Sequence, residues 1–397
     1  MTMTVPSPSR VSPHPEPDGS ADRAVLADLC EIARCPISGS RLRPATGAEL
    51  DDANRSASES WLTHRDGTAV QSGITAGLVT ETGDYLYLLK DGIALFLPEY
   101  AIALDPRRRH DSAELRSEKQ NVKSFYDDFG WARDGKGDFE DAVIWEDLRP
   151  VSADYLHRCH LRVNDYLAPR GRYLLDAASG PVQYDEYLTY SQNYHRRVCV
   201  DLSFRALQEA RRKLGDRALY VLGDITNLPF MDGAMDAVVS LHTLYHVPAD
   251  EQRKGFEELY RVLKPGRTGV VVYHWQHSAV TRLLNALASP LQKLKHATRR
   301  PSAPAPTSEP SSREAPPAWE TELYYHAHAY RWFTSQQWSF PLEFVVWRTL
   351  GVQCMRTWIR PKAMGRAVLA LLYRLENLLP HLAGRLGEYP MLVLRKG

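Results

Sequence analysis

Polar side chains close four apolar runs in the middle of the chain. Asp176 closes the first run, Asp201 closes the second 25 residues later, and Asp224 follows the third. Ser240 and His242 follow the fourth. An acidic side chain at the end of the second strand of a nucleotide-binding fold accepts both hydroxyls of a ribose. The spacing therefore predicts a site for a nucleotide-like cofactor.

The elements that must position these side chains alternate between strand and helix. The predicted strands are Tyr173–Asp176, Val198–Asp201, Ala218–Leu222, a run within DGAMDAVVSLHTLYHV, Thr268–Tyr273, EFVVWRTLG and YPMLVLRKG. The predicted helices between and around them are Ala153–Leu167, Phe204–Leu214, Glu251–Leu263 and Ala363–Asn377. Such alternation predicts an α/β fold with a mostly parallel, seven-stranded, Rossmann-like sheet, helices on both faces and ligands beyond the carboxyl ends of the strands.

Four motifs resemble those of a class I S-adenosylmethionine-dependent methyltransferase of the type 11 kind. They occur in order over about 150 residues as LLDAASGP, VCVDLS, GDITNLPF and ELYRVLKPGR. The resemblance implies that Asp176 and the backbone of Ala177–Gly180 hold the methionine part of S-adenosylmethionine, Asp201 the ribose, and Asp224 with Ile225 the adenine. The expected cofactor contacts in full are Tyr126, Asp176, Ala177, Ser179, Gly180, Asp201, Leu202, Asp224, Ile225, Ser240 and His242.

The first motif departs from the glycine-rich turn that is usual in this family. The chain has Asp176-Ala-Ala-Ser-Gly180 followed by Pro181, and alanine restricts φ where glycine would not. Either the loop is re-shaped or cofactor binding is weakened or lost, so a cofactor-free relative stays open as an alternative. A dehydrogenase is disfavoured because the chain has no GxGxxG turn.

The segments before this fold are expected to form three parts. Residues 1–22 are rich in Pro and Ser and predict a disordered tail. Residues 23–105 predict a small β-rich domain with a hairpin at Asp91-Gly92, and CPISGSRL with this hairpin resembles a Trm112-like domain. Its relatives often bind zinc, but only Cys30 and Cys35 are present with His64 far away, so no metal is expected.

Residues 106–150 predict a linker and a lid segment. The linker is charged, and FYDDFGW, which contains Tyr126, could place a short helix across a cofactor. Packing in the core is the alternative for these aromatic side chains. The main domain then occupies residues 151–397.

An insertion at about 295–319 is rich in Pro, Ser and Ala and predicts a mobile surface segment. An insertion after the fifth strand lies at the rim of the expected site, so the aromatic stretch behind it supplies candidate substrate contacts. These candidates are Tyr325, His326, His328, Tyr330 and Trp332. Their alternative is a packed aromatic seam.

Two histidines near strand ends are candidates for a catalytic base. They are His246 and His274, chosen because a free imidazole side chain ordinarily titrates near neutral pH. Methyl transfer is an in-line displacement for which a base is optional, and a lone histidine is more often a structural hydrogen bonder.

The composition of the whole chain narrows the function classes. Lys plus Arg number 49 and Asp plus Glu 48, so nucleic acid is not expected as a partner. Five scattered cysteines predict a reducing compartment, with the cytoplasm as default. No apolar run is long enough to span a bilayer. The helix at Ala363–Asn377 could lie on a membrane, but covering the sheet is the favoured role, and a homodimer is left open.

The sequence therefore predicts a methyltransferase that uses S-adenosylmethionine. The expected acceptor is an O or N nucleophile of a small molecule: a secondary metabolite, a sugar or a lipid-linked compound. The alternatives are a non-catalytic scaffold that binds a partner, and a different reaction of the same cofactor such as cyclisation or decarboxylation.

Overall fold

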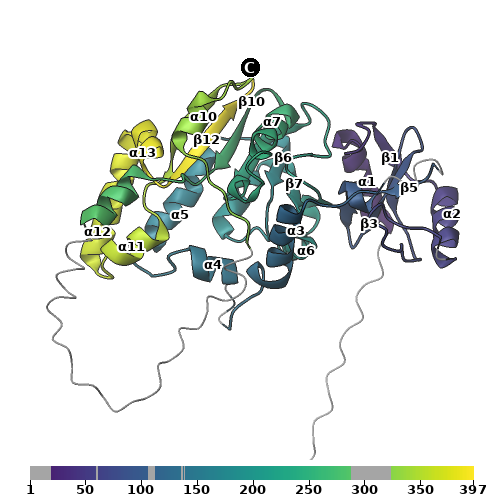
Figure 1. Cartoon of the computed structure of the whole chain (residues 1–397), viewed down its shortest axis with the longest axis horizontal. Coiled ribbons are helices and arrows are strands. Elements are labelled where there is room, and N and C mark those ends of the chain that lie inside the picture. The colour runs from purple at the N-terminus through teal and green to yellow at the C-terminus, as the bar shows by residue number, and fades with distance from the viewer. Residues whose placement is uncertain (1–18, 60, 106–111, 136, 138, 288–322) are drawn as a thin grey trace, which may run out of the picture.

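A computed structural model describes residues 19–59, 61–105, 112–135, 137, 139–287 and 323–397 (Figure 1). The predicted mobile insertion at 295–319 and residues 1–18 of the predicted tail lie outside these ranges. The first helix, α1 (Gly19–Ile32), begins within the segment assigned to the tail.

The main sheet confirms the expected Rossmann-like α/β class. Its strands lie in the order β8-β7-β6-β9-β10-β12-β11. Neighbouring strands from β8 to β10 are parallel, whereas β12 is antiparallel to both β10 and β11. The bounds are β6 Gly171–Ala177, β7 Tyr194–Asp201, β8 Ala218–Leu222, β9 Met235–Leu241, β10 Leu263–Val272, β11 Leu342–Arg348 and β12 Tyr389–Arg395. These seven strands are those that the apolar runs predicted, but the predicted count of seven for the whole sheet was wrong, because five strands of the N-terminal unit extend it to twelve among the described residues.

Helices cover both faces because the strands send alternate apolar side chains to opposite sides. In β6, Tyr173 and Leu175 enter one core and Leu174 enters the other. The first core is covered by α1, α7 (Gln252–Val262) and α10 (Tyr330–Ser335), and the second by α5 (Ala153–Leu161), α6 (Phe204–Leu214), α11 (Val352–Trp358) and α12 (Ala363–Leu378). A further helix covers residues 279–287, and α13 (Pro380–Leu386) packs on β11.

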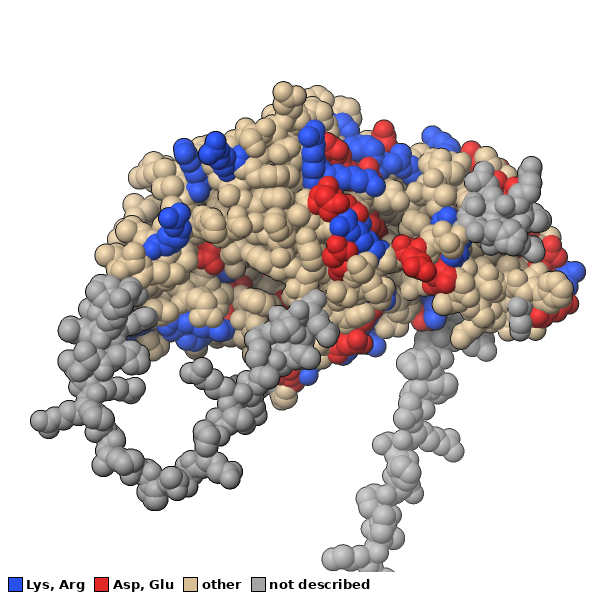
Figure 2. All heavy atoms as spheres, viewed as in Figure 1, with Lys and Arg blue, Asp and Glu red and all other residues tan. Residues whose placement is uncertain are grey.

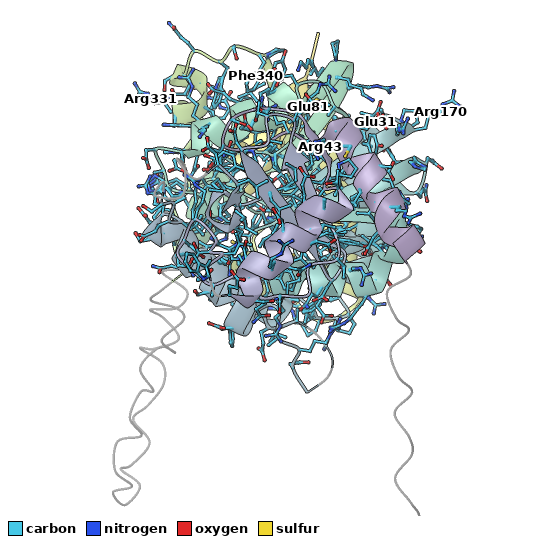
Figure 3. All side chains as sticks on the ribbon, turned by 90° about the vertical axis from the view of Figure 1, so that its right-hand side faces the viewer. Glu31, Arg43, Glu81, Arg170, Arg331 and Phe340 are labelled. Atoms are coloured by element: carbon cyan, nitrogen blue, oxygen red, sulfur yellow. The ribbon has the colours of Figure 1, made fainter. Side chains whose placement is uncertain are left out.

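The small N-terminal unit is β-rich, as expected, and it extends the main sheet. It contains α2 (Gly47–Ser58) and five strands: β1 Leu42–Pro44, β2 Gly77–Thr80, β3 Tyr85–Lys90, β4 Ile93–Leu95 and β5 Ile102–Ala103. The β3–β4 hairpin turns at Asp91 and Gly92, which have φ angles of 51° and 70°. Figure 3 views the molecule from this end, with Glu31 of α1 and Arg43 of β1 labelled.

The junction between the two parts is a strand pair. β4 runs parallel to β8, and the Phe96 amide donates to the Leu222 carbonyl at 2.9 Å. Leu29, Tyr87 and Phe96 share a single core with strand residues of the main sheet. The unit is therefore continuous with the main domain in both hydrogen bonding and packing. Its Trm112-like character stays a prediction.

Candidate active site

A cavity of about 640 Å³ lies beyond the carboxyl ends of the parallel strands. Segments that follow four strands line it: 178–181 after β6, 201–203 after β7, 223–225 after β8 and 241–243 after β9. The helices α3 (Ser117–Phe125) and α4 (Glu140–Trp145) supply further lining residues. The volume lies in the range of small-molecule and cofactor sites.

The turn after β6 follows a glycine-like path although alanine occupies its first critical position. Ala178 has a φ of 57° and Gly180 a φ of 53°, both in the left-handed region. A side chain at position 180 would come within 2.9 Å of the Trp131 ring, so only glycine fits there. The left-handed conformation costs a non-glycine residue about 1–2 kcal/mol. Ala178 therefore holds local strain at the cavity wall.

The charge of Asp176, near the end of β6, is compensated by an arginine on the neighbouring strand. Arg197 of β7 donates from Nε to Asp176 Oδ2 at 2.9 Å and from its terminal nitrogen to the same oxygen. Both side chains are buried. Arg197 also donates to the Tyr187 carbonyl at 2.6 Å, which ties the pair to the segment behind the turn.

Asp201 at the end of β7 is held in place by two backbone amides. Gly180 donates to Oδ2 and Ser203 donates to Oδ1, each at 2.8 Å. Burial raises the pKa of Asp201 to about 6, and these two hydrogen bonds oppose the rise. The carboxylate faces the cavity, and each oxygen keeps a second lone pair with which to accept a ligand hydroxyl.

Asp224 after β8 is engaged by a lysine from α3. Lys119 Nζ lies 2.6 Å from Asp224 Oδ2, and it also pairs with Glu251 and donates to Thr226 Oγ1 at 2.8 Å. The Thr226 amide donates to Asp224 Oδ1 at 2.8 Å. α3 is thereby fastened over the end of the cavity where the resemblance places adenine.

Aromatic side chains from the segment after α3 cover the turn. The rings of Tyr126 and Trp131 stack with centroids 4.9 Å apart, and Trp131 packs on Gly180. The indole nitrogen of Trp131 is buried without a hydrogen-bond partner in the described structure. Burial raises the pKa of the Tyr126 phenol well above its usual range. Tyr126 therefore lines the cavity in its protonated form.

A linked trio of side chains lies on the other side of the cavity. The Tyr325 hydroxyl lies 2.5 Å from Nδ1 of His274, and Nε2 of His274 lies 3.5 Å from Glu388 Oε1. All three residues line the cavity. Burial raises the pKa of Glu388, but hydrogen bonds from His274 and Thr281 outweigh it and the net pKa is lowered. An ionised Glu388 can orient His274 so that Nδ1 accepts the proton of Tyr325.

The other two cavity histidines are in apolar surroundings. Burial lowers the pKa of His246 to about 4, although a hydrogen bond between Nδ1 and the Tyr324 carbonyl at 2.9 Å opposes this. Burial also lowers the pKa of His242 well below its usual range. The His242 ring meets Trp347 edge to face with centroids 4.6 Å apart. Both imidazoles are therefore neutral at pH 7.

Several residues named from the sequence do not reach the cavity. Ala177 and Ser240 are fully buried within the sheet, and the Ser240 hydroxyl has no partner among the described residues. Of the aromatic candidates, only Tyr325 lines the cavity. The others form a packed seam, in which His328 and Trp332 stack at 3.9 Å and Tyr330 lies edge to face with Trp275. His326 belongs to this seam through its contact with His328.

Other cavity residues were not identified from the sequence. Arg348 of β11 is buried, pairs with Glu146 at 2.5 Å and lies 4.7 Å from the centre of the Tyr389 ring. Asp141 of α4 has its pKa raised to about 7 by burial and by the nearby Glu146. For Arg348 the sequence offered one signal, since a charged residue stands inside the apolar strand run VVWRTL.

The described residues show no metal site and fit the expected cofactor in part. Within the described ranges no group of three or more His, Cys, Asp or Glu side chains is arranged so that it could hold a metal ion. The left-handed turn and the doubly anchored Asp201 suit a nucleoside-bearing ligand, because the turn lets backbone approach the ligand and the carboxylate can accept ribose hydroxyls. At the adenine end Asp224 keeps acceptor capacity beside Lys119.

Comparison with known proteins identifies the central part of the chain. Residues 175–271 match the family described as "Methyltransferase domain". A demethylmenaquinone methyltransferase of Paenarthrobacter aurescens is 28% identical over 169 residues, which are 43% of this chain and 63% of that protein. One from Clavibacter sepedonicus is 41% identical over 98 residues, covering 24% and 38%.

The chain is also similar to a further curated protein and to a solved structure. A sterol 24-C-methyltransferase of Eremothecium gossypii is 46% identical over 63 residues, 16% of each chain. The crystal structure of the [4+2]-cyclase SpnF aligns with 16% identity and a TM-score of 0.39 over 71% of this chain and 97% of that one. The chain spans less than two thirds of the length of each of the curated relatives described here. At residues 175–271 the chain therefore matches a methyltransferase domain.

Proposed function

We propose that the protein transfers a methyl group from S-adenosylmethionine to a hydroxyl or amine of a small, largely apolar acceptor. The observation that carries this proposal is that one cavity joins four strand ends to the Tyr325–His274–Glu388 trio. A cofactor site and a proton acceptor thus share one cavity.

In this proposal each strand end holds a different part of the cofactor. Asp201 is the acceptor for the ribose hydroxyls, Asp224 serves the adenine end, and the turn at 178–180 holds the methionine part. The bound cofactor supplies an electrophilic methyl group on a sulfonium. The aromatic cover of Tyr126 and Trp131 excludes water from this side of the cavity.

The trio on the acceptor side handles the proton. An acceptor hydroxyl or amine must lose a proton as its bond to the methyl carbon forms. His274 takes that proton through the Tyr325 hydroxyl, which passes its own proton to Nδ1, and Glu388 beside Nε2 stabilises the imidazolium that results. His246 is less suited to this role because its pKa lies near 4.

The lining of the acceptor side favours an apolar molecule. Ile144, Trp145 and Val352 lie there with Tyr389. Trp145 is 54% exposed, so it also forms part of the outer surface. Two of the similar proteins are named for demethylmenaquinone and for a sterol, which supports an acceptor with an apolar ring system.

Titration calorimetry with S-adenosylmethionine and its demethylated product tests the cofactor part. The wild-type chain should bind both, and Asp201→Ala should lose most of this binding. Asp216→Ala removes an exposed aspartate behind α6 and should bind normally. An absence of binding in the wild-type chain would favour the non-catalytic scaffold instead. Binding unchanged in Asp201→Ala would overturn the role given to Asp201.

A product assay tests the reaction. The acceptor should gain one methyl group while the cofactor loses one. A product without the added methyl, formed only in the presence of the cofactor, would instead point to cyclisation or decarboxylation.

A further inference from the structure

The outward face of α12 carries an apolar stripe. Its members are Met364, Val368, Leu371, Leu375 and Leu378, each between 48% and 73% exposed. Leu379 and Leu382 continue it into α13, at 50% and 51% exposure. Single exposed apolar side chains are ordinary on a protein surface, but a contiguous row of seven marks an interaction site.

The stripe is distinct from the side of α12 that covers the sheet. At about 100° per residue, its five members on α12 fall within an arc of about 80°. The buried residues Gly365, Leu369 and Glu376 are centred about 120° away from it. The helix therefore serves as the sheet cover that the sequence predicted and still presents a second apolar side to solvent.

Within the segment that carries the stripe the exposed charges have one sign, whereas Asp154 of the neighbouring α5 lines a groove with Arg366. Between residues 356 and 387 the exposed charged side chains are all cationic: Arg356, Arg360, Lys362, Arg366, Arg374 and Arg385. The single acidic residue in this range, Glu376, is 1% exposed and pairs with Arg162. Figure 2 shows blue Lys and Arg atoms with little red over this end of the molecule.

The segment that carries the stripe is joined to the cavity wall through α11. α11, which precedes α12, contributes Val352 and Gln353 to the cavity lining. Arg356 of α11 donates to the carbonyls of Val143 and Glu146 at 3.2 and 2.8 Å, which joins α11 to α4. On α4 the exposed Trp145 lies at the cavity wall.

We propose that the α12 face docks on an anionic lipid surface, from which the cavity receives its apolar acceptor. Exposed apolar side chains flanked by cations are the composition of a helix that lies in a membrane interface. The stripe would be buried at the acyl boundary, and the arginines would contact lipid phosphates. Among the described helices none is long and apolar enough to cross the bilayer, so the contact is peripheral. The delivery of an acceptor rests on the proposed function, whereas the docking does not.

The same charges disfavour a second copy of the chain as the occupant. In a two-fold symmetric interface the patch would face itself, so the six cations of one copy would approach those of the other. Like charges brought together in this way oppose association. An anionic surface compensates them.

Vesicle sedimentation tests the docking. Wild-type protein should sediment with vesicles of phosphatidylcholine and phosphatidylglycerol and much less with phosphatidylcholine alone. Leu371→Asp/Leu375→Asp places two charges on the stripe and should lower the partition coefficient about tenfold or more. Trp61→Asp alters a side chain that is 75% exposed beyond α2, at the opposite end of the molecule, and should bind like wild type (Figure 1).

A second variant separates the charges from the apolar contact. Arg374→Gln/Arg385→Gln removes two exposed cations beside the stripe and should lose much of the preference for anionic vesicles, because each cation near the surface adds to the attraction. Calorimetry with S-adenosylmethionine should give the wild-type affinity in both double variants. A cofactor-binding failure would overturn the proposed function and leave the vesicle result standing.

Three outcomes would overturn the docking proposal. The first is wild-type protein that does not bind anionic vesicles. The second is a Leu371→Asp/Leu375→Asp variant that binds them as wild type does. The third is a wild-type dimer in light scattering that this variant converts to a monomer, because the stripe would then be an interface between copies.

Discussion

Arg197 on β7 and Asp176 on β6 form a buried ion pair between neighbouring strands, with Nε 2.9 Å from Oδ2. The pair lies directly below the turn that shapes the cavity. Removing the cation leaves a buried carboxylate without compensation, which costs about 3–5 kcal/mol.

Arg197→Met should therefore lower the free energy of unfolding by about this amount in urea denaturation. The double variant Arg197→Met/Asp176→Asn removes both charges and should recover part of the loss. If the double variant is as unstable as the single one, packing around Arg197 rather than the charge pair accounts for the effect.

The strain at Ala178 predicts an unusual response to glycine. Ala178→Gly releases about 1–2 kcal/mol of left-handed strain but adds about 0.4–1 kcal/mol of chain entropy in the unfolded state. The net expectation is that the free energy of unfolding, measured by thermal denaturation, rises by about 0–1.6 kcal/mol. Ala177→Gly is the matched control: Ala177 is a buried strand residue, so this change should cost about 1 kcal/mol.

The raised pKa of Asp201 predicts that cofactor binding depends on pH. With a pKa of about 6, the carboxyl is ionised at pH 8 and mostly protonated at pH 5, where it is a poorer acceptor. The affinity for S-adenosylmethionine should fall about tenfold over this range in calorimetry. Asp201→Asn should show weak binding that varies much less with pH.

A fall in pH weakens cofactor binding through Asp201 but is expected to raise the contribution of Asp201 to folding stability. Its pKa in the folded state lies above the ordinary value of 3.8, so between about pH 4 and 6 the folded chain binds more protons than the unfolded one. The contribution of Asp201 to stability therefore rises as the pH falls through 6. Comparing wild type with Asp201→Asn in denaturation curves at pH 5 and pH 8 isolates this contribution.

If the trio around His274 handles the proton, changes to it should lower turnover without changing the affinity for S-adenosylmethionine. His274→Gln should lower kcat by about 10²–10⁴-fold and leave the affinity for S-adenosylmethionine unchanged. Tyr325→Phe should reproduce part of the loss if the proton passes through the phenol. His277→Gln alters an exposed histidine outside the cavity and should turn over normally. An unchanged kcat in His274→Gln would mean that the acceptor needs no base.

The shared core predicts that the small unit and the main domain unfold together. Phe96 is 1% exposed and contacts Tyr87 edge to face at 5.3 Å, so Phe96→Ala should cost about 3–5 kcal/mol. Denaturation should remain a single transition in wild type and variant. Trp61→Ala, at an exposed site, should change stability by less than about 0.5 kcal/mol. Two resolved transitions would show instead that the small unit is independent.

Much of the main sheet could be predicted because its strands are covered on both faces. Runs such as YLL and AVV are apolar throughout, and the helices between them have clear periodicity. Asp201 and Asp224 could be located because they stand where such runs end. Local sequence is sufficient for features of this kind.

The partners of these residues could not be predicted, because they are distant in the chain. Lys119 reaches Asp224 across 105 residues and Arg348 reaches Glu146 across 202. The pairing of β4 with β8 involves three residues of each strand. Ala178 has a positive φ, which alanine normally avoids. Local sequence could not predict this conformation, because the packing around the turn, such as that of Trp131 on Gly180, outweighs the preference of alanine.

The pairing of β4 with β8 also has a consequence for handling the protein. A chain shortened to begin at residue 112 would keep every motif of the cofactor site but would expose the backbone amides and carbonyls of β8. Open strand edges recruit other chains and promote aggregation. The small N-terminal unit thus protects the solubility of the domain beside it, and expression of the main domain alone is expected to yield insoluble material.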